Sequence, residues 1–387
     1  MSSFRLLFRS RKYLVSAVFY LCFSVLFSTW VTYIPYVCEK LSLSEGQFGA
    51  ALFFSALGSF ITIPIANALV NKIGVGRIVF YALFYFAFSV LMPLLAFSYT
   101  SLCIGLFLLG SGSCLFNISI NSLTGTLEKQ DKVMIMSTSH GFFSAGGMLG
   151  ASLGGVIAAF FHNPLLHFGI IAFLLVAFQV YNRKYYFNVK SEKIKHSSVK
   201  LISFKPLVLI ALVGLILMVA EGAIADWSAL YLKRVVHVEA ALFGFGFAAF
   251  AFAMTMGRFI GDWISRKFGS WQIIMGGSIV SLFGFFLILV AHLTATLIGF
   301  SVVGLGFSII VPEIYRMAAR TKNIETSTGV AFIAGVANIG FLVGPVLLGF
   351  LAELRSLRFS FFALACFVVI AILISVYQVF KRKTIVQ

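Results

Sequence analysis

The sequence predicts an all-α integral membrane protein with twelve transmembrane helices in two pseudo-symmetric six-helix bundles. Its 387 residues are 60% hydrophobic and 11% charged, whereas a soluble domain has roughly 25% charged residues. Apolar runs of about 20 residues, enough to cross a bilayer, recur along the chain. The second half also repeats the glycine pattern of the first. These three observations disfavour a soluble fold.

Each apolar run begins and ends at charged residues, Gly, Pro or Asn, as expected at the ends of spans. The basic N-terminus leads into a run of full span length without a small-residue cleavage site, which indicates a first membrane helix and not a signal peptide. The first six spans are expected at 13–38, 45–70, 77–97, 100–127, 134–161 and 164–182. The second six are expected at 206–232, 240–265, 271–291, 294–320, 325–352 and 357–380.

The polar segment 183–205 is predicted to be a cytoplasmic linker between an N-terminal bundle, 1–182, and a C-terminal bundle, 206–387. The net charge of +17 is distributed in short clusters between apolar runs. That pattern is typical of topology determinants and not of a surface that binds nucleic acid. With the N-terminus in the cytoplasm, 23 Lys and Arg residues lie on the cytoplasmic side and five on the opposite side. Both termini are therefore expected in the cytoplasm.

Glycines recur between the two halves at a nearly constant offset. "GLFLLGSGSCLFNISIN" aligns with "GFSVVGLGFSIIVPEIY", and "HGFFSAGGMLGASLGG" with "AGVANIGFLVGPVLLG", both at an offset of 194. Two tandem six-span repeats are typical of a transporter architecture that binds its substrate near the membrane midplane. The glycines themselves are expected to allow close contact between helices. The matched pairs are Gly110/Gly304, Gly112/Gly306, Gly146/Gly340, Gly150/Gly344 and Gly155/Gly349.

With these repeats the chain resembles the major facilitator superfamily over essentially its whole length. The superfamily's loop motif between spans 2 and 3, G-x-x-x-D-R-x-G-R-K, is present in weakened form as "NALVNKIGVGR", with Asn71 in place of the Asp and with Arg77 at its end. In the second half, "GRFIGDWISRKFG" carries Arg258 and Asp262 four residues apart. The resemblance implies gating roles for these four residues.

Four stretches are similar to one branch of the superfamily, the bacterial inner-membrane proteins resembling the rhizopine-associated membrane protein MosC. They are "AEGAIADWSALYL", "GSGSCLFNISIN", "SHGFFSAGGMLGA" and "GLGFSIIVPEIYRMA". The resemblance implies transport across the bacterial inner membrane, without fixing a cargo. The branch often has Asp where this chain has Asn117, so we expect no titrating group at that position.

Two acids, Glu221 and Asp226, lie in the predicted seventh span. Five residues turn a helix by about 140° beyond a full turn, so the two acids are expected on different faces. Glu221 shares its face with Ser228 and lies near the midplane, whereas Asp226 lies closer to the outer end. A charge inside the bilayer is costly and usually functional, so Glu221 is the first candidate for proton coupling and Asp226 the second. The alternative for Glu221 is a structural acid that packs against a neighbouring span. Asp226 could instead act at the extracellular gate, form a structural ion pair or face water.

The neighbouring Gly222 is expected to allow local bending or unwinding of the seventh span, which often accompanies midplane sites. In span 10, Glu313 precedes Arg316 by three residues, which places the two on one helix face. They are predicted to form a local pair at the inner gate, with a role for Glu313 in the central cavity as the alternative.

Neutral polar side chains are candidates for contacting the solute. They could instead hydrogen-bond each other across helices. Aromatic rings could stack on a sugar-like ring of the solute. Trp30 and Trp227 are expected to occupy equivalent positions in the two halves if a two-residue indel is allowed. The candidates are Asn117, Asn121, His140, Ser144, Asn338, Trp30, Tyr33 and Trp227.

The sequence therefore predicts a secondary active transporter that moves a small polar organic solute, such as a polyol or sugar derivative, by alternating access with proton coupling through Glu221. A proton-driven exporter of drugs or metabolites and a non-transporting receptor or scaffold are the alternatives. The sequence has no ATP-binding motif and no catalytic or metal-binding constellation, and its five Cys lack CxxC spacing. We expect no enzymatic activity, cofactor or metal. The expected partners are the solute, protons and membrane lipid, and the expected state is monomeric.

Overall fold

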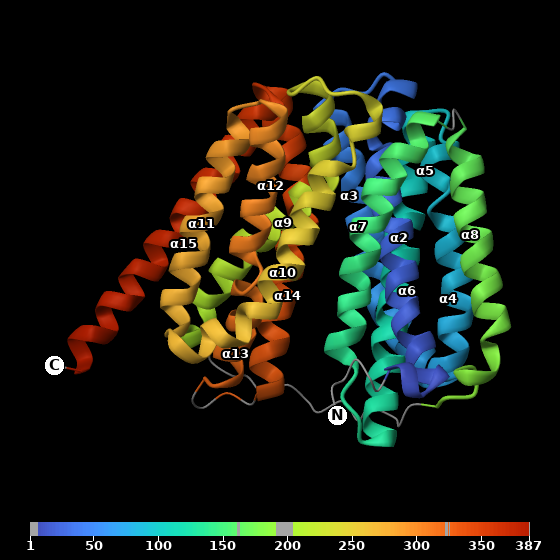
Figure 1. The fold of residues 1–387 in the computed structure, drawn as a ribbon, viewed down its shortest axis with the longest axis horizontal. Coiled ribbons are helices and arrows are strands. Elements are labelled where there is room, and N and C mark those ends of the chain that lie inside the picture. The colour runs from blue at the N-terminus through green and yellow to red at the C-terminus, as the bar shows by residue number, and fades with distance from the viewer. Residues whose placement is uncertain (1–6, 161–162, 191–203, 322–323, 325, 387) are drawn as a thin grey trace. The chain divides into compact units, whose positions relative to one another are not determined.

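The computed structural model describes residues 7–160, 163–190, 204–321, 324 and 326–386. Within these residues the chain is helical and contains no strand. Twelve helices or broken helices in the described part are long and apolar enough to cross a membrane. The predicted all-α fold with twelve spans is confirmed (Figure 1).

Contacts between residues divide the chain into two compact units. Unit 1 comprises Met1–Leu43, Ala50–His196 and Ala240–Gly244, and unit 2 comprises Ser44–Gly49, Ser197–Glu239 and Phe245–Gln387. Most of the predicted linker, 191–203, lies outside the described residues.

The helices up to the linker are α2 (Arg11–Lys40), α3 (Glu45–Ile73), α4 (Val75–Ser89), α5 (Met92–Leu95), α6 (Tyr99–Asp131), α7 (Met136–Phe160) and α8 (Pro164–Tyr181). Those after it are α9 (Val208–Arg234), α10 (Phe245–Lys267), α11 (Ser270–Leu289), α12 (Leu293–Phe307), α13 (Ile310–Ala319), α14 (Thr326–Leu354) and α15 (Leu357–Val386). Short 3₁₀ helices lie at Arg183–Tyr185, Lys205–Leu207 and Ala240–Leu242.

The repeated glycines bring equivalent helix pairs into backbone contact in both units. In unit 1, a Cβ added at Gly146 or Gly150 of α7 would lie 2.5 Å from the carbonyl oxygen of Leu21 or Val25 in α2. In unit 2, a Cβ at the matched glycines of α14 would lie at least as close to the carbonyl oxygens of Leu215 and Val219 in α9. The prediction that these glycines allow close helix contact is confirmed.

These contacts also fix the sequence register between the two repeats. Leu21 and Leu215 differ by 194 positions, as do Val25 and Val219, so the offset of 194 runs through α2 and α9 without an indel. The expected correspondence of Trp30 with Trp227 is therefore wrong, because Trp227 matches Tyr33 at this offset. By the same register, Phe27 occupies the position of Glu221.

Two spans that we expected to be continuous are broken. The third divides into α4 and α5 near Pro93, and the tenth divides into α12 and α13 at Ser308 and Ile309. Pro312 explains the second break, because proline has no N–H to donate to the carbonyl four residues earlier and its ring clashes with that carbonyl. The carbonyl concerned is that of Ser308, at the break itself.

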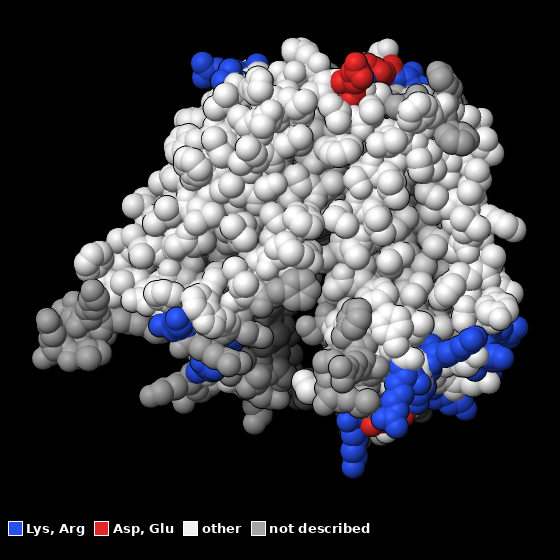
Figure 2. All heavy atoms as spheres, in the orientation of Figure 1, with Lys and Arg blue, Asp and Glu red and all other residues white. Residues whose placement is uncertain are grey.

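On the face drawn in Figure 2, the Lys, Arg, Asp and Glu side chains lie at the ends of the helices, and other residues form the surface between them. Large apolar side chains are exposed on several helices, which suits contact with lipid and not with water. Examples from three helices are Phe53, Phe173 and Phe283, exposed by 51%, 70% and 58%. The chain is a multi-pass integral membrane protein.

Candidate functional site

Unit 1 gathers polar side chains from three helices into one cluster. The Tyr20 hydroxyl of α2 donates to Asn121 Oδ1 of α6 at 3.0 Å. Asn121 Nδ2 in turn donates to the carbonyl oxygen of Asn117 at 2.8 Å and to its Oδ1 at 3.1 Å. The ring of His140 on α7 lies 4.9 Å from that of Tyr20, measured between centroids. Three of the predicted solute contacts, Asn117, Asn121 and His140, are thus brought together.

The two asparagines have different roles within this cluster. Asn121 uses its amide oxygen and its amide nitrogen within the cluster, so it holds its neighbour in place. Asn117 is half-buried, and no described residue accepts a hydrogen bond from its Nδ2. The cluster therefore presents the Asn117 amide N–H groups as donors. Tyr20 was not predicted, since a single tyrosine among many aromatic residues gives no distinguishing signal in the sequence.

The other predicted solute contacts lie apart from this cluster or are packed in the interior. Ser144 Oγ donates to the His140 carbonyl at 3.3 Å within α7. Asn338, its repeat partner on α14, is exposed. Trp30 is 1% exposed, and Tyr33 is 3% exposed with its hydroxyl 3.0 Å from His167 Nδ1.

Trp227 is fully buried in unit 2 and is held there by α14. Its Nε1 donates to the Pro345 carbonyl at 2.9 Å. Pro345 lies inside α14 and leaves the Phe341 carbonyl, four residues earlier, without its helical donor. A Cβ at Gly222 would lie 2.6 Å from that same oxygen. Gly222 thus permits close packing of α9 on α14, and α9 continues through it without the expected unwinding.

Glu221 lies on α9 among charged and polar groups from two other helices. It is half-buried and interacts electrostatically with Arg258 of α10 and Tyr315 of α13. Among the described residues, no ion pair joins Glu221 directly to Arg258, so their interaction acts at longer range. The Cβ of Ser228 lies 3.2 Å from a Cβ built at Gly246 of α10. The predicted shared face of Glu221 and Ser228 is therefore turned toward α10.

Asp226 lies on a different stripe of α9. It follows Leu215, Val219 and Gly222 at helical spacing, and these three contact α14. Asp226 is half-buried and, among the described residues, makes no hydrogen bond or ion pair. The two acids therefore have different surroundings, as their spacing predicts.

The predicted gating residues occupy separate places. Glu313 of α13 is 3% exposed, and it accepts hydrogen bonds from Ser265 at 3.0 Å, Ser270 at 2.6 Å and Arg316 at 2.6 Å. The expected local pair of Glu313 and Arg316 is present, joined by two serines that sequence reasoning missed. Ser265 lies within the stretch "GRFIGDWISRKFG" and Ser270 directly follows it, so this stretch could have indicated their position.

The remaining gating candidates have exposed side chains or side chains outside the described part of the structure. Asn71 of α3 is exposed, and the guanidinium carbon of Arg77 lies 5.8 Å from the ring centroid of Phe187. The side chain of Asp262 lies outside the part of the structure that is described, so its predicted pairing with Arg258 stays a prediction.

Comparison with known proteins identifies the family. A family model described as Major Facilitator Superfamily matches residues 13–323. The chain belongs to the major facilitator superfamily. As a superfamily member with transporters among its relatives and structural neighbours, it is a secondary transporter and not an enzyme.

Relatives of this superfamily member come from bacteria. An uncharacterized MFS-type transporter of Yersinia pestis is 28% identical over 86% of this chain and 87% of its own length. An uncharacterized transporter of Sinorhizobium fredii is 29% identical over 89% and 92%. The membrane protein MosC of Rhizobium meliloti is 27% identical over 93% and 89%. The predicted resemblance to a MosC-like branch is confirmed.

Solved structures show the same fold. A point mutant of the nucleoside transporter NupG matches with a TM-score of 0.76 and 10% identity over 95% of this chain and 99% of its own. A bacterial homologue of the human lysosomal transporter Spinster matches with a TM-score of 0.70 and 14% identity over 96% and 97%. At these identities the likeness concerns the fold alone.

Proposed function

We propose that this transporter moves a small polar organic solute across the bacterial inner membrane by alternating access, coupled to protons through Glu221. The observation that carries the proposal is the placement of Glu221 on α9, where it interacts with Arg258 and Tyr315. Ionisable groups within spans mark ion and proton pathways. The orientation that goes with it has both termini in the cytoplasm, as the distribution of Lys and Arg predicts.

Proton coupling follows from the charge balance around Glu221. When ionised, its carboxylate attracts Arg258 and holds α9 against α10. When it binds a proton, the attraction to Arg258 is lost and the two helices are released from each other electrostatically. A proton that binds more tightly in one conformation than in the other shifts the population between them. Asp226, on the α14 side, is the second candidate for the same role.

The polar cluster of unit 1 supports a polar solute with hydrogen-bond acceptors. Asn117 presents amide donors, and Asn121 and Tyr20 hold it in place. A buried donor that loses its partner costs free energy, so such a site favours a solute that supplies an acceptor. Polyols and sugar derivatives have this chemistry.

Reconstituted protein tests the coupling. A thermal-shift screen of polyols, sugars and nucleosides first selects a stabilising solute. In proteoliposomes, Glu221→Gln should retain exchange of that labelled solute and lose accumulation driven by a pH gradient, because Gln has the shape of Glu but does not carry the proton. The control is Glu239→Gln, an exposed acid, which should retain both activities. Undiminished accumulation by Glu221→Gln would contradict proton coupling through this residue.

The alternatives have distinct outcomes in the same system. A proton-driven exporter would accumulate solute in vesicles only when the gradient is reversed. A receptor or scaffold with this fold would bind the solute and show no counterflow.

A further inference from the structure

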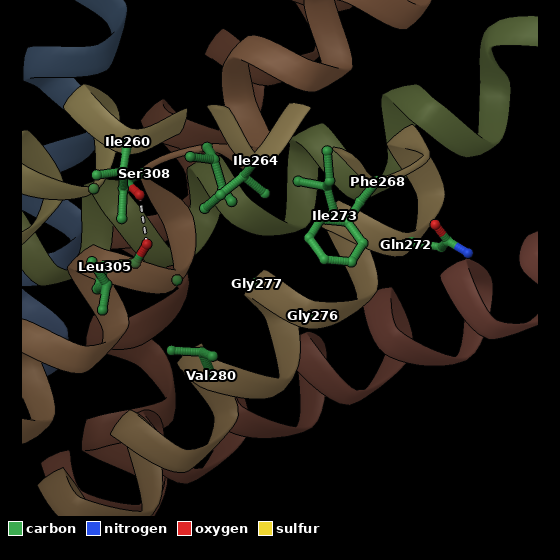
Figure 3. Close-up of a pocket in the computed structure, with 13 residues that line it drawn as sticks. Ile260, Ile264, Phe268, Gln272, Ile273, Gly276, Gly277, Val280, Leu305 and Ser308 are labelled. Atoms are coloured by element: carbon green, nitrogen blue, oxygen red, sulfur yellow. Dashed lines mark hydrogen bonds between the residues drawn. The ribbon is translucent and has the colours of Figure 1, made fainter. Parts of the chain in front are cut away.

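A groove of about 370 Å³ opens on unit 2 between α10 and α11, with α12 contributing to its wall (Figure 3). The lining is apolar apart from Gln272 and Ser308. The Ser308 hydroxyl is already engaged, since it donates to the Leu305 carbonyl at 2.5 Å. The volume lies within the range of about 300–1,000 Å³ that is typical of ligand sites. The apolar lining includes Ile260, Ile264, Phe268, Val280 and Leu305.

Glycines account for the groove. A Cβ at Gly277 of α11 would lie 2.6 Å from the Gly306 carbonyl of α12, so these two helices pack closely. At the adjacent Gly276 an added Cβ would meet nothing within 4 Å. The missing side chain at Gly276 therefore leaves an unfilled space beside the close contact of α11 with α12. Ile260 and Phe268 on the rim are 52% and 54% exposed, so the groove is open sideways.

One end of the groove has a polar lining residue and a lysine close to it in sequence, at the end of α10. Gln272 lies at the same end as Phe268, and Leu305 and Val280 lie toward the other (Figure 3). Lys267 follows Ile260 and Ile264 at helical spacing, is exposed, and has its Nζ 4.0 Å from the ring centroid of Trp263. Glu313 of α13 contacts the same α10–α11 turn through Ser265 and Ser270, and it is buried and paired with Arg316.

We propose that this groove binds an acyl chain of an anionic phospholipid, with the headgroup at Lys267 and Gln272. The lateral opening faces the hydrocarbon of the membrane that the spans cross, so the bilayer itself supplies the occupant. A laterally open apolar groove with Gln272 and the exposed Lys267 near one end suits an amphiphile that carries a negative headgroup. The headgroup lies at the α10–α11 loop, in the cytoplasmic leaflet of the proposed orientation.

Native mass spectrometry of the purified full-length protein with phosphatidylglycerol tests the groove. The wild type should retain one lipid per chain. Gly276→Leu should reduce retention at least about tenfold, because the new side chain takes the space of the acyl chain and removes its apolar burial. The matched control is Gly169→Leu on α8, where an added Cβ also meets nothing within 4 Å. It should retain lipid as the wild type does.

A second variant tests the headgroup end without altering the packing. Lys267→Gln should reduce retention of phosphatidylglycerol about fivefold, the effect of one Lys near an anionic surface, and leave retention of phosphatidylcholine unchanged. Equal retention by Gly276→Leu and the wild type would overturn the proposal, as would equal retention of phosphatidylglycerol by Lys267→Gln. A protein dimer that replaces the lipid adduct and is lost in Gly276→Leu would assign the groove to a second copy and also overturn it.

Discussion

At the scale of single residues, the two units place different chemistry on equivalent helices. Unit 1 holds a neutral hydrogen-bonded cluster of Tyr20, Asn117 and Asn121. Unit 2 holds an acid, Glu221, with Arg258 as its countercharge. Neutral amides can exchange hydrogen bonds with a solute, whereas an acid with nearby opposite charge can exchange a proton. The division supports separate roles for the two units in solute binding and in coupling.

Tyr20→Phe should weaken solute binding without changing the maximal exchange rate. The substitution removes the donor to Asn121 Oδ1, so Asn121 no longer fixes the position of Asn117. One neutral hydrogen bond contributes about 0.5–1.5 kcal/mol, so the KM for exchange of the selected solute should rise about three- to tenfold. Tyr85→Phe on α4 is the control and should leave KM unchanged. An unaltered KM for Tyr20→Phe would show that the cluster is structural.

At the scale of elements, α9 and α14 pack closely where a glycine of α9 faces a carbonyl exposed by a proline of α14. Pro345 leaves the Phe341 carbonyl without a helical donor, and Gly222 brings α9 directly against that oxygen. The adjacent Pro345 carbonyl is satisfied by Trp227. Close packing here places Glu221, one residue before Gly222, at a fixed rotation relative to α10 and α13.

Gly222→Ala should destabilise this pair. The added methyl group would lie 2.6 Å from the Phe341 carbonyl oxygen, and overpacking of this kind costs about 1–3 kcal/mol. The melting temperature in detergent should fall accordingly. Gly335→Ala on α14, where an added Cβ meets nothing within 4 Å, should leave it unchanged or slightly raised, since Ala favours the helix by up to about 1 kcal/mol. Equal melting temperatures for the two variants would refute the close contact.

Hydropathy was sufficient to predict the helices, because each span must satisfy its backbone within itself and be apolar over its length. The glycine repeat was sufficient to predict that α7 and α14 approach other helices closely, but not that their partners are α2 and α9. The break before Pro312 was missed because apolar residues continue through it. The pairing of Trp30 with Trp227 was wrong because it matched residue types and not the register set by the glycines. Tyr20, Ser265 and Ser270 were missed because their partners are distant in sequence.

At the scale of the whole molecule, the distribution of charge sets the expected topology. Lys and Arg are concentrated on the loops that follow even-numbered spans and at both termini, and such asymmetry orients membrane proteins. A fluorescent protein fused to the C-terminus should therefore fluoresce, and alkaline phosphatase fused after Glu239 should be active. The reciprocal fusions serve as controls. Phosphatase activity at the C-terminus would contradict the predicted orientation.

The register between the units shows that two charged residues of unit 2 have no charged counterpart in unit 1. At an offset of 194, Phe27 stands where α9 has Glu221. Around Arg258 the offset is 195, because the Gly110 contact with Ser55 in unit 1 matches the Gly304 contact with Phe250 in unit 2. At this offset Ile63 stands where α10 has Arg258. The electrostatic interaction between α9 and α10 is therefore a property of the second repeat alone.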